Sequence, residues 1–252
     1  MKPVVPCLGV VLLTIGCGGD TQRHLLSPTT VSTPVPTLTQ RAELTHKVSG
    51  TVTTAGVPVS DAEVAELKTV FGDDCFTPRE LSDTRSDASG SYVLPAVTDS
   101  STSMWASWVR AYKAGYFTDF QRPRVSQDMR LDFTLDPWTH VSPGQSIRGT
   151  VDRGDAVCRG NSYGLPGFCH RFAITVPTSG TLEVTLTWPN VRPDVLLDVV
   201  SPGGIPCALF SWPGGTRHSL KIPAEAGATY EVRVVDDGNA SPLTYELTTL
   251  LR

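Results

Sequence analysis

Apolar and polar residues alternate along much of the second half of the chain, in short runs separated by turn-forming residues. A period of two puts every second side chain on the same face of a β-strand. Turn clusters recur every 8–12 residues or so, which is the spacing of a β-sandwich or jelly roll. The apolar positions of these runs are Phe172, Ile174 and Val176; Leu182, Val184, Leu186 and Trp188; Leu220 and Ile222; Tyr230, Val232 and Val234; and Tyr245 and Leu247.

The first half predicts strands of the same kind. Residues 48–52 alternate, and 91–95 follow a turn at 86–90 in which Asp and Ser are able to bond their own backbone. Residues 108–116 indicate a strand that runs into a turn, and 129–135 indicate a closing strand. These segments favour a sheet-rich fold in this half as well.

One segment of the first half has a different period. Val64, Leu67 and Phe71 fall at helical spacing, so periodicity alone favours a helix over residues 62–71. Every flanking segment indicates sheet. We therefore predict that residues 62–71 belong to the sheet.

The beginning of the chain has the pattern of an export signal. Lys2 precedes a short apolar run from Val4 to Ile15, and small residues surround Cys17. Such a run is too short for a permanent membrane span and is typical of a secretory signal. Because it ends in Gly-Cys, it also resembles the lipobox of bacterial lipoproteins, which implies that residues 1–16 are removed and that Cys17 is lipidated. The alternative is an ordinary signal peptide and a secreted protein.

Residues 17–44 differ from the alternating segments, because Ser, Thr and Pro dominate and bulky apolar residues are few. Such a composition buries too little apolar surface to fold and predicts a disordered tether. As a random coil, its 27 residues after Cys17 would span roughly 30 Å. No later segment approaches 18 consecutive apolar residues, so the sequence predicts no transmembrane helix.

Composition narrows the class of partner. The chain has 252 residues, 22 glycines, 20 prolines and a formal charge of −4 at pH 7. The excess of Gly and Pro falls between the apolar runs and favours an all-β chain with many turns. Without a cluster of like charges, the sequence has no electrostatic footprint for nucleic acid and no polybasic membrane patch.

Four segments of the first half have a characteristic order. They are Val48-Ser49-Gly50-Thr51-Val52, Gly56-Val57-Pro58-Val59 with Ala62-Glu63-Val64, Ser86-Asp87-Ala88-Ser89-Gly90-Ser91-Tyr92, and Lys113-Ala114-Gly115-Tyr116. Over about 46–136 the chain resembles the carboxypeptidase regulatory-like domain. The resemblance implies a transthyretin-like β-sandwich without catalytic residues, in a family grouped with carbohydrate-binding-like folds.

Two segments of the second half carry another resemblance. They are Pro143 to Asp155 (PGQSIRGTVDRGD) and Ala226 to Val234 (AGATYEVRV). Over about 141–251 the chain is similar to the bacterial pre-peptidase C-terminal domain, which implies a non-catalytic β-sandwich. We therefore expect an all-β fold with two consecutive β-sandwich domains, a transthyretin-like sandwich at 45–137 and a jelly-roll-like sandwich at 138–252.

Four cysteines lie beyond the leader and the proposed anchor. Cys158 and Cys169 bracket a Gly/Pro-rich loop and are the best candidates for a disulfide. Cys75 and Cys207 fall in different predicted domains, so a bond between them stays open. Four cysteines allow three connectivities, and sequence alone does not choose among them.

A search for chemistry gives one formal motif. Gly160-Asn161-Ser162-Tyr163-Gly164 matches the nucleophile elbow, with Asp155 and His170 as conceivable partners. The strand before it and the helix after it that this motif requires are missing, and we expect a glycine-rich loop instead. A serine hydrolase that uses Ser162 is the remote alternative.

Metal and cofactor sites are not indicated. The five histidines and the cysteines lack zinc-ligand spacing, so we expect no metal and no cofactor. Calcium stays an alternative at Asp194, Asp198 and Asp236-Asp237, although acidic turns are usually only solvated.

Aromatic residues are the better functional candidates. Trp108 and Tyr112 fall on one face of a predicted strand, and Trp105 and Val109 on the other, so one set should be core and the other partly exposed. Exposed rings suit sugar faces and protein hot spots, whereas in the alternative both tryptophans fill the sandwich. The candidate ligand-binding aromatics are Trp105, Trp108, Tyr112, Tyr116 and Trp212.

The function that follows is non-catalytic binding outside the cytoplasm. We expect a cell-envelope lipoprotein, attached to the membrane through its lipid anchor, that presents two β-sandwiches, with carbohydrate as the first ligand by resemblance. The alternative is an adhesion or scaffold protein that contacts other envelope proteins or peptidases. Fold alone does not decide between them.

Overall fold

The computed structural model describes residues 45–68, 79–98, 108–158, 167–192, 194–207, 215–236 and 242–252. These ranges contain strands, turns and loops but no helix, and hence none that could cross a membrane. They belong to one compact unit, Ala42–Arg252. The protein is therefore all-β, as the alternating pattern predicts.

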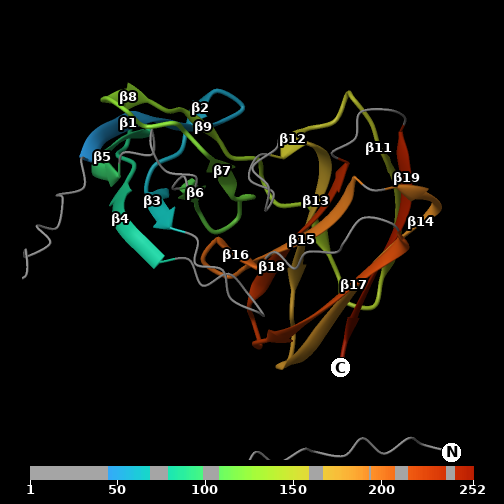
Figure 1. The fold of residues 1–252 in the computed structure, drawn as a ribbon. Coiled ribbons are helices and arrows are strands. Elements are labelled where there is room, and N and C mark those ends of the chain that lie inside the picture. The colour runs from blue at the N-terminus through green and yellow to red at the C-terminus, as the bar shows by residue number, and fades with distance from the viewer. Residues whose placement is uncertain are drawn as a thin grey trace, which may run out of the picture. The chain divides into compact units, whose positions relative to one another are not determined.

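The strands of the first half form two sheets (Figure 1). One contains β1 (Thr45–Thr54), β2 (Val57–Pro58), β5 (Ser91–Thr98), β8 (Met129–Arg130) and β9 (Phe133–Thr134), in the order β2-β1-β5 with β8 and β9 parallel to β1. The other has the order β4-β3-β6-β7, with β3 at Glu63–Lys68, β4 at Arg79–Arg85, β6 at Trp108–Tyr112 and β7 at Asp119–Gln121.

Alternation explains how these two sheets pack. Val48 and Leu94 of the first sheet and Val64 and Val109 of the second are fully buried in one cluster. Their neighbours along each strand point away from this cluster. The two sheets therefore enclose a core, and we call this half the first sandwich.

The segment with helical spacing is a strand over the part that the structure describes. Glu63–Lys68 forms β3, which pairs with both β4 and β6. The prediction of sheet is confirmed there, and residues 69–71 lie outside the described ranges. Pairing on both sides overrides the local period of three to four residues.

Gly50 shows why β1 requires a glycine. A Cβ at this position would lie 1.9 Å from the carbonyl oxygen of Leu131. The segment that carries β8 and β9 runs parallel to β1 and passes close to Gly50, and the Leu131 amide donates a 2.8 Å hydrogen bond to the Ser49 carbonyl. A side chain at position 50 would separate the two segments.

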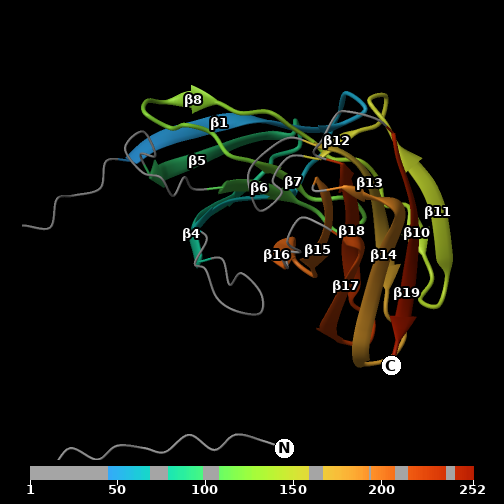
Figure 2. The ribbon, with the colours of Figure 1, turned by 45° about the vertical axis from the view of Figure 1, so that its right-hand side comes forward.

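The second half also forms two sheets (Figure 2). One has the order β10-β13-β18-β15-β16, with β12 paired to β13. Its strands are β10 (His140–Val141), β12 (Val157–Cys158), β13 (Gly167–Thr175), β15 (Val195–Ser201), β16 (Ile205–Cys207) and β18 (Thr229–Asp236). The other has the order β11-β19-β14-β17, with β11 at Ser146–Val151, β14 at Gly180–Arg192, β17 at Gly215–Ala224 and β19 at Leu243–Leu251.

A large apolar core lies between these two sheets, and we call this half the second sandwich. Trp188, which the pattern predicts to be a core residue, is 4% exposed there. Ile174 and Val232 of one sheet and Leu186 and Leu247 of the other are fully buried in the same cluster. The alternating positions of the sequence therefore identify this core.

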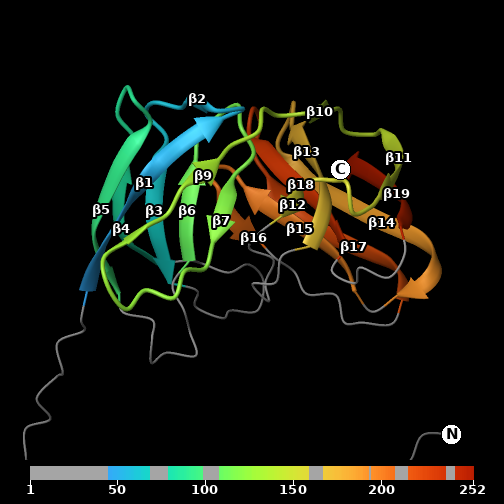
Figure 3. The same ribbon diagram turned by 90° about the horizontal axis from the view of Figure 1, so that it is seen from above.

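The two sandwiches meet along a third packed layer, which we call the joint. In it, Ala65, Leu67 and Phe120 of the first sandwich form one buried cluster with Val200 of the second. Strands β6 and β7 accordingly lie beside β15 and β16 (Figure 3). Strands β3 and β6 of one sheet and β15 and β18 of the other therefore have buried residues on both faces.

Candidate functional site

Strand β6 separates its side chains as the sequence predicts. Val109 and Ala111 are fully buried in the core of the first sandwich. Trp108, one position earlier, packs against the joint cluster and is partly buried. Tyr112 is also partly buried. The Trp108 and Tyr112 side of β6 is therefore the side that faces away from the core.

Trp108 combines an aromatic ring with a nearby cation. The Arg122 guanidinium carbon lies 5.7 Å from the centre of the ring. This distance is within the range of a cation–π interaction. Trp108 is therefore a partly buried indole that packs against the joint cluster on the outward side of β6, with a guanidinium beside its ring.

Tyr112 lies against the turn between β15 and β16. A Cβ at Gly204 would fall 2.9–3.0 Å from three atoms of Tyr112, so only glycine permits this approach. Gly204 also has a positive φ of 72°. The second sandwich thus covers part of the surface that Tyr112 would offer to a ligand.

The remaining aromatic candidates do not extend this surface. Tyr116 packs on the core of the first sandwich and forms an isolated bridge with Pro137. Trp105 and Trp212 lie outside the described residues, as do Cys17, Cys75 and Ser162. Trp108 and Tyr112 are therefore the candidates on the outward side of β6, and the β15–β16 turn covers part of Tyr112.

The joint contains a set of buried charges that the sequence pattern does not predict. The Arg110 side chain is 3% exposed, and its Nη1 donates a 2.8 Å hydrogen bond to the carbonyl of Gly203. Its Nη2 pairs with Glu63, and Glu80 lies 3.6 Å away. This arginine of β6 therefore binds both its own sheet and the β15–β16 turn.

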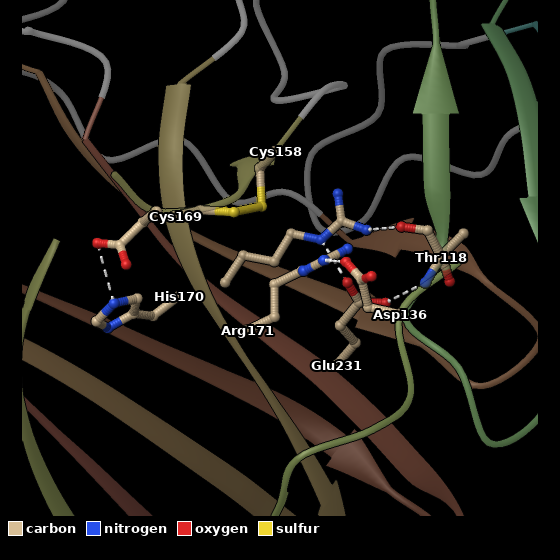
Figure 4. The surroundings of a disulfide bond; sticks show 9 residues. Thr118, Asp136, Cys158, Cys169, His170, Arg171 and Glu231 are labelled. Atoms are coloured by element: carbon tan, nitrogen blue, oxygen red, sulfur yellow. Dashed lines mark hydrogen bonds and ion pairs between the residues drawn. A yellow bond between two sulfur atoms is a disulfide. The ribbon is translucent and has the colours of Figure 1, made fainter. Parts of the chain in front are cut away.

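A second set of buried charges points from β18 toward the first sandwich (Figure 4). Glu231 Oε2 accepts a 2.9 Å hydrogen bond from the Thr118 amide, and Arg233 Nη2 donates a 2.7 Å bond to the Thr118 carbonyl. Arg233 Nε also donates to Glu231 Oε1 at 2.7 Å. One residue of the first sandwich thus has both main-chain groups bound by β18.

Arginine–phenylalanine contacts border these bonds. The guanidinium of Arg171 lies 5.0 Å from the ring centre of Phe117, and that of Arg233 lies 5.1 Å from the ring centre of Phe120. Arg171 also pairs with Asp136 (Figure 4). The guanidinium groups of Arg171 on β13 and Arg233 on β18 therefore lie over aromatic rings of the first sandwich.

Asp198 is the third charged residue of this buried set. It lies on β15, directly opposite Arg233 of β18 in the sheet register. Burial raises the pKa of Asp198, Arg233 lowers it and Glu231 raises it, and the net result of the three effects is a pKa of about 6. This carboxyl therefore titrates closer to neutral pH than an exposed aspartate.

A sequence signal for the joint exists in the strands that form it. Residues 195–200 are apolar on both faces apart from Asp198, and every residue of β15 up to Val200 is buried. A continuous apolar run indicates a strand covered on both sides. The charged residues Glu231 and Arg233 alternate with core residues of β18 and would ordinarily be taken as solvent-exposed.

Cys158 and Cys169 are joined by a disulfide that closes β12 onto β13 (Figure 4). Both cysteines are buried in a small cluster with Leu196 and Val235. Cys207 pairs through its backbone with Val199, and nothing is described of its side chain. The loop spacing of Cys158 and Cys169 predicts the pair that the structure contains.

The structure brings together His170 and Asp155, two residues conceivable as partners of Ser162. Nε2 of His170 lies 3.2 Å from Asp155 Oδ2, and Nδ1 lies 2.7 Å from the hydroxyl of Tyr245. Burial raises the pKa of Tyr245 above its usual range, and Asp155 adds to this shift. Both ring nitrogens of His170 are therefore engaged by Asp155 and a neutral tyrosine.

The acidic residues considered for calcium are mostly matched by arginine. Arg192 Nη2 donates a 2.9 Å hydrogen bond to Asp236, and Arg192 Nε lies 3.6 Å from Asp194. Asp198 faces Arg233 instead, and Asp237 is outside the described ranges. Across those ranges, no group of three or more His, Cys, Asp or Glu side chains has the arrangement of a metal site.

No protein-family model and no curated protein matches the sequence. Among solved structures, the chain is similar to the pre-peptidase C-terminal domain of a collagenase from Bacillus anthracis, with 15% identity over 45% of this chain and 96% of that domain and a TM-score of 0.33. It is also similar to CBM35 from Paenibacillus barcinonensis, with 15% identity over 42% and 99% of the two chains and a TM-score of 0.27. Similarity at this level assigns no ligand to this chain.

Proposed function

We propose that this protein is an exported, lipid-anchored binding protein without catalytic activity, and that its first ligand class is carbohydrate. The observation that carries the proposal is Trp108, a partly buried indole outside the sandwich core with Arg122 beside its ring. A partly exposed indole ring offers flat apolar surface, which suits the apolar face of a sugar.

The sequence supports the rest of the proposal. We propose that residues of about 46–136 belong to the carboxypeptidase regulatory-like family and those of about 141–251 to the pre-peptidase C-terminal family. We further propose that residues 1–16 direct export, that Cys17 is the lipidated residue, and that residues 17–44 are the tether. This arrangement would present the two sandwiches outside the cytoplasm at a membrane.

A glycan array with the full chain tests the ligand class. We expect a glycan that binds the wild-type chain to bind Trp108→Ala about tenfold less tightly or worse, the loss typical of a truncated anchor residue. Trp138→Ala is the matched control, because Trp138 is also partly buried but contacts His140 between the two sandwiches. Circular dichroism of both variants checks that they are folded.

Two results would contradict this assignment. Equal glycan binding by Trp108→Ala and the wild-type chain would remove Trp108 from the site. A folded wild-type chain that binds no glycan on a broad array would contradict the carbohydrate class and favour the alternative of an adhesion or scaffold protein.

We also propose that the protein is not a serine hydrolase. A catalytic histidine needs one ring nitrogen for its orienting carboxylate and the other for the nucleophile. In this chain the second nitrogen of His170 is engaged by Tyr245. Ester or peptide hydrolysis that disappears in both Ser162→Ala and His170→Ala would overturn this part of the proposal.

A further inference from the structure

We propose that the two sandwiches form a single cooperative and rigid unit, held by reciprocal clamps in which buried side chains of each sandwich bind the main chain of the other. The inference is independent of the proposed ligand. Separate domains in one chain ordinarily move relative to each other unless their interface is large and apolar. In the joint, directional hydrogen bonds supply the rigidity that a small apolar cluster alone does not.

The first clamp holds Thr118. Glu231 and Arg233 orient each other through their 2.7 Å bond and present an acceptor and a donor to the amide and the carbonyl of one residue. Arg233 and Glu231 are 2% and 5% exposed. Charge-assisted bonds in such an enclosed place are stronger than neutral ones and hold a fixed geometry.

The second clamp points in the opposite direction. Arg110 of the first sandwich donates to the carbonyl of Gly203, while Glu63 holds the other side of the guanidinium. Gly204, the next residue, packs against Tyr112 at a distance that excludes any side chain. The β15–β16 turn is therefore fixed both by a bond and by shape.

The chain between the sandwiches is paired rather than free. The Phe117 amide donates a 2.8 Å bond to the Asp136 carbonyl, and the Trp138 amide donates a 3.0 Å bond to the Gly115 carbonyl. On the other side, the Ala173 amide donates to the Thr139 carbonyl at 2.8 Å. Strand β10 then continues along β13. This connection has no unpaired stretch long enough to act as a flexible hinge.

Opening the joint would therefore break three contacts together. The two clamps would exchange their bonds for water, and the apolar cluster of Ala65, Leu67, Phe120 and Val200 would become exposed. The clamping side chains come from β6 and β18, strands that are paired on both sides within their own sheets. Loosening one sandwich therefore removes partners from the other. Such mutual dependence is the condition for a single cooperative transition.

Calorimetry of the full chain tests the coupling. We expect one thermal transition whose calorimetric enthalpy equals the van 't Hoff enthalpy. Two variants remove one clamp each: Arg110→Met, and the double variant Glu231→Gln, Arg233→Met. In each we expect the transition to split in two, or the ratio of calorimetric to van 't Hoff enthalpy to rise above one. Arg148→Met is the matched control, because Arg148 pairs with Glu246 on an exposed face of the second sandwich.

Hydrogen exchange of the wild-type chain gives a second measurement that needs no variant. We expect the slowest amides of β1 in the first sandwich and of β14 in the second to open with the same free energy, equal to that of global unfolding. Two transitions in the wild-type chain, different opening free energies for the two sandwiches, or clamp variants that keep the wild-type enthalpy ratio would each overturn the proposal.

Discussion

Asp198 carries a carboxylate into an almost fully enclosed position, where its exposed fraction is 6%. Because burial disfavours the charged form, its pKa rises to about 6, well above the usual value of an aspartate. In the unfolded chain the same group would return to its ordinary pKa. The folded state therefore holds the Asp198 proton more tightly than the unfolded state does.

This difference gives a pH dependence with a definite sign. The contribution of Asp198 to stability is fully present below about pH 4 and is lost as the pH rises through about 6. Relative to Asp198→Asn, we expect the wild-type chain to gain about 2 kcal/mol of unfolding free energy when the pH falls from 7.5 to 4.5. Urea unfolding of both proteins at the two pH values measures it, and equal pH dependence would contradict the raised pKa.

At the scale of elements, the alternating pattern was sufficient to predict sheet. Residues 172–175 fall within β13 and residues 182–188 within β14. In the described part of the segment with helical spacing, Glu63–Lys68, pairing on both sides of β3 outweighs the conflicting period. The pattern was not sufficient to assign the outward faces. Glu231 and Arg233 occupy positions that alternation assigns to solvent, yet a second sheet covers them.

The β12–β13 hairpin offers a prediction at this scale. Its disulfide closes a loop with a sequence separation of 11, and cross-linking such a loop restricts the unfolded chain. We expect the double variant Cys158→Ala, Cys169→Ala to lose about 2–3 kcal/mol of unfolding free energy, measured by urea denaturation without reductant. The wild-type chain in reductant should approach the variant. A variant as stable as the oxidised wild-type chain would contradict this prediction, because it would show that the disulfide adds little to the unfolding free energy.

For the molecule as a whole, the sequence predicted more of the fold than of the site. Strand alternation correctly separated Trp108 from the core residue Val109, because that separation is local to β6. In the clamp on Thr118, Glu231 is 113 positions away along the chain and Arg233 is 115 positions away. Contacts between residues so far apart in the sequence produce no periodic pattern. The signal that indicates a second covered face is the nearly continuous apolar run of β15.

The proposed attachment to a membrane belongs to this scale as well, and it depends on one thiol. If Cys17 is lipidated, the full chain expressed in a bacterial host should incorporate labelled palmitate, and Cys17→Ser should lose the label because a serine hydroxyl does not replace the cysteine sulfur. Cys7→Ser is the matched control, since Cys7 lies in the same apolar leader but is not preceded by the small-residue exit.

Cell fractionation distinguishes lipidation from export, because it measures the chain in the membrane fraction and the chain that stays in the cytoplasm. Acyl chains contribute about 0.8 kcal/mol per buried CH2 group to membrane binding, so the labelled wild-type chain should sediment with membranes. The Cys17→Ser chain should still leave the cytoplasm, because the cationic start and the apolar run are intact. A label that persists in Cys17→Ser would place the lipid elsewhere, and a variant that stays in the cytoplasm would show that Cys17 serves export rather than anchoring.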